Sequence, residues 1–203
     1  MRFLAAWVLG SGLVISSAGA QPAESPTRAE AMPAPHTALR WKPASFRWIY
    51  STAHEPEWLA PGAGLALFRR AAEHWKHCGV NIEFAGETAQ GPQTPDGVNV
   101  LGWAASMAPG LRGITRRRNR GPELVEADIL IAAGNPEFRS APELLSKVIT
   151  HEFGHALGLV HSPDCRDVMS FGANCRGIPP ERLPQQPTQG DLAQCRVRYV
   201  ELI

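Results

Sequence analysis

Three histidines constrain this chain more than any other feature, because their spacing dictates both a helix and the place where it ends. Residues 151–161 read HEFGHALGLVH. Residues four apart on an α-helix lie on the same face, so His151 and His155 can direct two imidazoles at one point. His161 reaches that point only if the helix stops and the chain turns back, and Gly158 can adopt the left-handed backbone that such a turn needs. The pattern therefore predicts a helix that ends near Gly158 and a cluster of three imidazoles.

Three neutral imidazoles are a typical ligand set for catalytic zinc, because they leave one coordination position open for water. Glu152 is rotated by about 100° from His151 around the helix axis, so it can act on that water as a general base without binding the metal. A closed structural site needs four protein ligands, and no fourth partner adjoins this motif. Zinc storage would likewise need more ligands than three histidines offer. We therefore predict one catalytic Zn²⁺ bound by His151, His155 and His161, with Glu152 as the catalytic residue.

The first twenty residues have the pattern of a secretory signal peptide. Arg2 precedes an apolar run over residues 3–15, and the segment ends in the small residues Ala18, Gly19 and Ala20. The run is shorter than the roughly 20 residues that cross a bilayer. Cleavage after Ala20 predicts a secreted or periplasmic protein with no membrane span, and an uncleaved N-terminal anchor is the alternative.

Export gives meaning to the four cysteines of the chain. An even number of cysteines in an oxidising compartment favours disulfides, and no CxxC spacing supports zinc binding instead. Four cysteines allow three pairings. We prefer Cys165 with Cys175, which closes a short loop, and Cys78 with Cys195, which ties the C-terminal segment to the rest.

The composition is that of one globular domain, since 44% of the 203 residues are hydrophobic and 19% are charged. The net charge of +1 predicts no nucleic-acid partner. Residues 21–40 are rich in Ala and Pro and predict an extended lead-in, so the catalytic domain is expected over residues 41–203.

A cluster of arginines in or beside an edge strand could attract an acidic substrate or a polyanion, although a solvated loop is the favoured interpretation. Its members are Arg112, Arg116, Arg117, Arg118 and Arg120.

The hydrophobic periodicity predicts an α+β domain. Strands are expected over residues 45–50, 80–84, 98–103 and 124–132, with a weaker one around Ile114. Helices are expected over residues 64–78, 141–157 and 190–199, and an irregular loop over 162–188. Ser140 and Glu143 fit a capping box at the start of the second helix.

The histidine motif, followed by Met169, resembles the signature of the metzincin metallopeptidases. Within that group the similarity is to the matrixins, on the grounds of Ser162 after the third histidine, the eight-residue step from His161 to Met169, and the sequence EADI over residues 126–129. The resemblance covers about residues 41–200. It implies a metzincin-like (zincin) domain with a twisted mixed five-stranded sheet, an active-site helix, a methionine turn and a C-terminal helix.

The same resemblance implies a role for each site residue. The three histidines would bind zinc, Glu152 would act as base and proton shuttle, and Met169 would form a hydrophobic floor that does not touch the metal. Peptide substrates would lie along the sheet edge. The chain has no cysteine before the domain and no histidine between Val80 and Thr150, so it resembles a minimal matrixin of bacterial type, without a cysteine-switch prosegment or a second zinc. Calcium is compatible with the family, but no site for it is indicated.

The sequence thus predicts a secreted zinc-dependent endopeptidase that acts as a monomer on peptide or protein substrates. The alternative is a catalytically silent, metal-bearing binding or inhibitory protein of the same fold.

Overall fold

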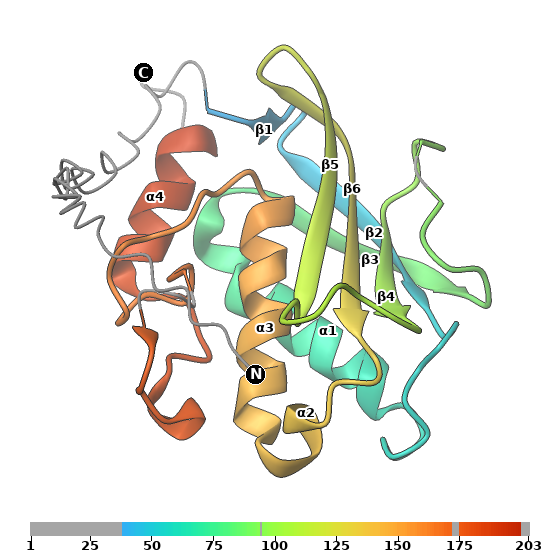
Figure 1. The fold of residues 1–203 in the computed structure, drawn as a ribbon. Coiled ribbons are helices and arrows are strands. Elements are labelled where there is room, and N and C mark those ends of the chain that lie inside the picture. The colour runs from blue at the N-terminus through green and yellow to red at the C-terminus, as the bar shows by residue number, and fades with distance from the viewer. Residues whose placement is uncertain (1–37, 94, 172–174, 200–203) are drawn as a thin grey trace, which may run out of the picture. The chain divides into compact units, whose positions relative to one another are not determined.

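The computed structural model describes residues 38–93, 95–171 and 175–199, so the expected signal peptide and most of the lead-in lie outside the described residues. Within these ranges, no helix is both long enough and apolar enough to cross a membrane. The described chain forms a mixed sheet with the helices α1, Ala63–His74, and α3, Pro142–Ala156, packed beside it (Figure 1).

The sheet is mixed, as expected, but it has six strands rather than five. Its order is β3-β2-β4-β6, with β1 and β5 also pairing with β6, and every pair is parallel except β5 with β6. The additional strand, β1, has only two residues, and so short a strand shows no alternation by which a sequence could reveal it. The strands are β1 Arg40–Trp41, β2 Ser45–Ser51, β3 Asn81–Thr88, β4 Val100–Ala104, β5 Gly113–Arg120 and β6 Glu123–Ala132.

The remaining helices are short or peripheral. They are η1 Lys76–Cys78, α2 Glu137–Ser140, η3 Pro180–Arg182 and α4 Gln189–Tyr199. The expected capping box at the start of α3 is wrong. Ser140 belongs to the unexpected helix α2 and its hydroxyl donates to the Glu137 carbonyl, while Ala141 is the N-cap of α3. Pro142 takes the first helical position, where its missing N–H costs nothing.

Aromatic side chains fix α3 between the sheet and α1. Phe153 of α3 contacts Trp48 of β2 edge to face, with ring centroids 5.7 Å apart, and both side chains are at most 1% exposed. Trp75, which follows α1, donates its indole N–H to the carbonyl of Thr150 at 2.9 Å. The helix is therefore held from two directions on either side of His151 in the sequence.

The end of α3 is packed against the first described residues. Gly158 has φ 92°, the left-handed conformation that the sequence predicts, and a Cβ there would collide with the carbonyl oxygen of Leu39. Trp41 donates its indole N–H to the carbonyl of Ala156 at 2.9 Å. Residues 38–41 thus lie against the turn that leads from the helix to His161.

Candidate metal centre

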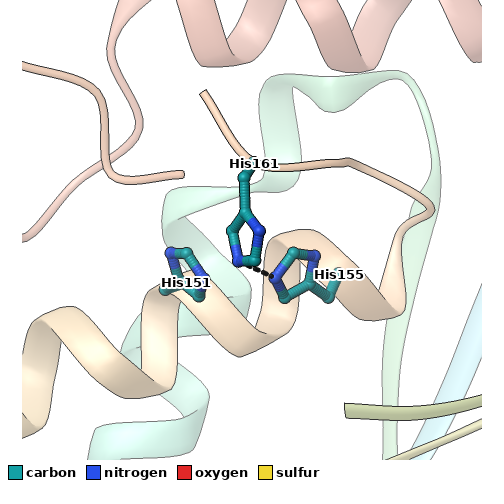
Figure 2. A group of neighbouring side chains, drawn as sticks. All are labelled: His151, His155 and His161. Carbon is teal, nitrogen blue, oxygen red and sulfur yellow. Dashed lines mark hydrogen bonds between the residues drawn. The ribbon is translucent and has the colours of Figure 1, made fainter. Parts of the chain in front are cut away.

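The structure brings the three predicted histidines together. His151 and His155 project from successive turns of α3, and His161 comes from the segment that follows it (Figure 2). One ring nitrogen of each histidine lies within 4.8 Å of those of the other two, and the Nε2 atoms of His155 and His161 are 3.1 Å apart. Among the described residues, this is the group of side chains that could hold a metal ion.

Backbone carbonyls set the tautomer of two of these imidazoles. Nδ1 of His151 lies 2.8 Å from the Val168 carbonyl, and Nδ1 of His155 lies 2.9 Å from the Leu159 carbonyl. Because a carbonyl only accepts, each Nδ1 carries the proton and each Nε2 keeps a lone pair for a metal. Burial lowers the pKa of His151 to about 4 and that of His155 to about 3. Both rings are therefore neutral at pH 7, which is the form of the imidazole that binds zinc.

Glu152 belongs to the same helix, α3, and is buried, with 6% of the residue exposed. Thr115 of β5 donates its hydroxyl to Oε2 of Glu152 at 2.7 Å, and the same hydroxyl lies 2.9 Å from the Glu152 backbone carbonyl. Burial raises the pKa of Glu152 to about 7, against the opposing effects of the Thr115 bond and the Arg117 charge. A carboxyl group with such a pKa can accept and return a proton near neutral pH. Sequence reasoning missed Thr115, because its strand was only weakly indicated and it lies far from the motif.

Met169 is completely buried against the ligand-bearing helix. A Cβ on Gly154 would collide with the sulfur of Met169. The glycine between the two helical histidines therefore leaves the space that the Met169 side chain occupies. The Ser162 N–H donates to the Met169 carbonyl at 2.8 Å, which joins the segment after His161 to the turn over residues 167–170.

Asp191 of α4 secures that turn from the other side. Its carboxylate accepts the backbone N–H groups of Val168 at 2.9 Å, Met169 at 3.2 Å and Thr188 at 2.9 Å, and the residue is 1% exposed. Asp167 adds to the network, because it accepts the Ser162 hydroxyl at 2.6 Å. No motif in the sequence indicated Asp191.

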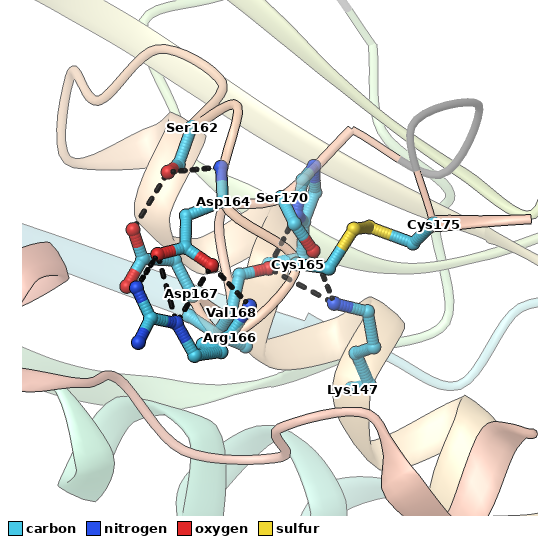
Figure 3. Close-up of a disulfide and its surroundings, with 10 residues drawn as sticks. Lys147, Ser162, Asp164, Cys165, Arg166, Asp167, Val168, Ser170 and Cys175 are labelled. Atoms are coloured by element: carbon cyan, nitrogen blue, oxygen red, sulfur yellow. Dashed lines mark hydrogen bonds and ion pairs between the residues drawn. A yellow bond between two sulfur atoms is a disulfide. The ribbon is translucent and has the colours of Figure 1, made fainter. Parts of the chain in front are cut away.

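Lys147 supports the same carbonyl that orients His151. Its ammonium donates to Ser170 Oγ at 3.0 Å and to the Val168 carbonyl at 3.3 Å (Figure 3). The Val168 carbonyl therefore accepts hydrogen bonds from both Lys147 and His151. Burial lowers the pKa of Lys147 to about 8, which leaves the group mostly charged at pH 7. Lys147 precedes His151 by one helical turn but was not recognised from the sequence.

Both disulfides join the pairs that the sequence analysis preferred. Cys165 and Cys175 close a short loop beside the Met169 turn, with Cα atoms 5.5 Å apart (Figure 3). Cys78 and Cys195 join η1 to α4 across 117 residues, with Cα atoms 5.3 Å apart.

The arginine cluster lies mainly in the edge strand β5, so the loop favoured from the sequence is wrong, whereas the expected edge strand and solvent exposure are confirmed. Arg116, Arg117, Arg118 and Arg120 belong to β5, and Arg112 just before it forms an ion pair of 2.6 Å with Glu137.

A mixed sheet beside a helix that carries HExxH, with a third histidine from the next segment, defines a zincin-type domain of the metzincin class. The matrixin family model matches residues 50–175, and the chain belongs to the matrixin family, as the sequence motifs predicted. Its fold is also similar to that of a chain in a solved structure described as the GM1 bound form of the ECX AB5 holotoxin. The TM-score is 0.55 with 15% sequence identity over 80% of this chain and 84% of that chain, a likeness of fold alone. No curated protein matches the sequence.

Proposed function

We propose that this chain is a secreted zinc-dependent endopeptidase that hydrolyses peptide bonds at the three-histidine group. One observation carries the proposal: His151, His155 and His161 converge beside a buried glutamate, in a chain of the matrixin family. The signal-peptide pattern and the two disulfides support export.

The residues of the chain divide the chemistry among them. A zinc ion held by the three histidines would supply Lewis-acid polarisation of the scissile carbonyl and would lower the pKa of a bound water toward about 7. Glu152 takes the proton of the attacking water and later delivers it to the leaving amine. Thr115 donates a hydrogen bond to Oε2 of that carboxylate, so the other oxygen, Oε1, is the one that exchanges the proton. Val168 and Leu159 keep two imidazoles in the tautomer that leaves Nε2 free. Met169 provides the apolar floor of a methionine turn.

The proposal is tested with the chain from residue 21 onward, loaded with one equivalent of zinc and incubated with a mixed peptide library. We expect cleavage that disappears on chelation and returns with zinc. Glu152→Gln should bind zinc with the same stoichiometry but cleave at least about a hundredfold more slowly, because the amide cannot accept the proton. Cleavage by Glu152→Gln at the wild-type rate would reject the assigned base. A folded, zinc-loaded wild type that cleaves nothing would favour the silent binding protein instead.

A further inference from the structure

The strand beside the histidine group carries a concentrated positive charge. β5 contains four arginines and no acidic residue. Among the described residues it pairs with β6 alone, so the N–H and C=O groups along its other edge can receive an additional strand.

Strand β5 contacts the proposed catalytic glutamate, Glu152, through Thr115. Thr115 bonds to the Glu152 carboxylate, and two residues further along β5 the guanidinium of Arg117 lies 3.4 Å from the His155 carbonyl. A peptide whose scissile bond lies near Glu152 would therefore continue past the basic half of β5, residues 116–120.

Alternation along the strand sorts the arginines between two faces. Thr115 and Arg117 face α3, so Arg116 and Arg118 face the opposite side of the sheet. Their Cα partners on β6 are Asp128 and Glu126, which are buried and accept the backbone N–H groups of Val100 and Gly97.

These carboxylates are held inside the sheet, whereas the two guanidinium groups reach solvent. The Arg118 side chain is 49% exposed, and its contact with Glu126 is a long one of 3.6 Å. Arg116 is also exposed. The outer face of the edge thus presents two cations, two residues apart, next to the line that an added strand would follow.

We propose that Arg116 and Arg118 select peptide substrates with acidic side chains at two positions, separated by one residue, on the N-terminal side of the scissile bond. The proposal rests on the proposed peptidase function. Antiparallel pairing is the commoner arrangement, and a peptide antiparallel to β5 places its N-terminal residues beside the basic half. Every second side chain of that peptide lies on the outer face, next to Arg116 and Arg118.

The expected preference is moderate, because exposed ion pairs are weak. One such pair corresponds to about a threefold gain and two to about a tenfold gain in kcat/KM. The preference should fall as salt is raised from 0.1 to 1 M, since the screening length shrinks from about 10 Å to about 3 Å.

The test compares two peptides of equal length that differ only in Asp and Glu against Asn and Gln before the scissile bond. We expect the acidic peptide to be cleaved about tenfold more efficiently. The double variant Arg116→Gln/Arg118→Gln should bring this ratio close to one, and reversal to Glu at both positions should favour a Lys-containing peptide. Arg47→Gln is the matched control, because Arg47 is an exposed arginine on β2, paired with Glu83, and should leave the ratio unchanged.

Three outcomes would overturn the proposal: a wild-type ratio near one, a ratio that survives the double substitution, or a preference for acids only after the scissile bond.

Binding of fluorescent peptides to zinc-loaded Glu152→Gln gives a readout without turnover. If the acidic peptide binds more tightly but the wild type cleaves neither peptide, the peptidase function is rejected. The selection of acidic peptides by Arg116 and Arg118 would still stand. If both peptides bind equally, and an oligonucleotide binds to the wild type but not to the double variant, the acidic peptide is the wrong ligand. The ligand of Arg116 and Arg118 would then be a polyanion.

Discussion

The two sides of the histidine group hold their charged residues in opposite ways. On the turn side, between His161 and α4, the two charged side chains that bond to residues 168–170 are buried: Asp191 is 1% exposed and accepts three backbone N–H groups, and Lys147 is 7% exposed with two acceptors. The ion pair of Arg166 with Asp164, in the same segment, lies at the surface. On the β5 side, Arg116 and Arg118 are exposed to solvent. Under the proposed function, this difference separates two tasks: one side would fix the histidines before a substrate binds, and the other would present charge to the substrate.

Substitution of Asp191 should produce the largest effect on this comparison. Asp191→Ala leaves the N–H groups of Val168, Met169 and Thr188 without their acceptor, and we expect a loss of about 3 kcal/mol or more in the free energy of unfolding. Urea unfolding of the metal-free protein measures it. Asp191→Asn keeps one acceptor oxygen and should lose less. An Asp191→Ala variant as stable as the wild type would show that the turn does not depend on α4.

The short disulfide tests the same side with a smaller effect on stability. Replacing Cys165 and Cys175 by Ala opens a loop with a sequence separation of 10, for which chain entropy predicts a loss of about 3 kcal/mol at most. Because this loop adjoins the Met169 turn, activity or substrate preference should change while the domain is still folded. The matched control is Cys78→Ala/Cys195→Ala, which should reduce stability without altering preference. Identical kinetics with the Cys165–Cys175 bridge open would contradict the expectation.

Thr115→Val tests the point where the β5 side reaches Glu152, the proposed catalytic base. The substitution keeps the shape of the side chain but removes the hydroxyl that donates to Glu152. We expect kcat to fall about tenfold, or roughly 1.4 kcal/mol, with KM unchanged, because a hydrogen bond to a charged group is lost. Thr115→Ser should retain most of the activity. Equal kcat values for the valine variant and the wild type would assign Thr115 a packing role only.

Arg117→Met should have the smallest effect. The guanidinium of Arg117 lies 3.3 Å from the Leu159 carbonyl, which also accepts Nδ1 of His155. Removing this long contact should weaken zinc binding by no more than about fivefold, measured by competition with a chromophoric chelator. A hundredfold loss of zinc affinity would show that β5 fixes the histidines as firmly as the turn does. The two sides of the histidine group would then not differ in this respect.

The three longest helices and the histidine cluster were predictable because their signals are local, whereas the short helices α2 and η3 were not expected. The expected helix over residues 64–78 corresponds to α1 and η1, and the glycine that stops it, Gly79, has φ 91°. The histidine spacing similarly encodes its own geometry, since a helix and one turn bring all three rings together.

What the sequence did not reveal depends on residues far apart in the chain. Asp191 supports Val168 from 23 residues away, and Thr115 reaches Glu152 across 37. Strand β5 was only weakly indicated because Arg117 occupies a position that faces α3, so polar residues stand on both faces and period-two alternation disappears.

The packing of residues 38–41 against the end of α3 sets where a recombinant chain should start. An expression product cut at residue 41, where the sequence alone places the start of the domain, would lose Leu39, whose carbonyl adjoins Gly158, together with Arg40 of β1. The segment that carries His161 would then lack a neighbour on one side. A purification tag is therefore best placed upstream of residue 38, with its cleavage site also before that residue.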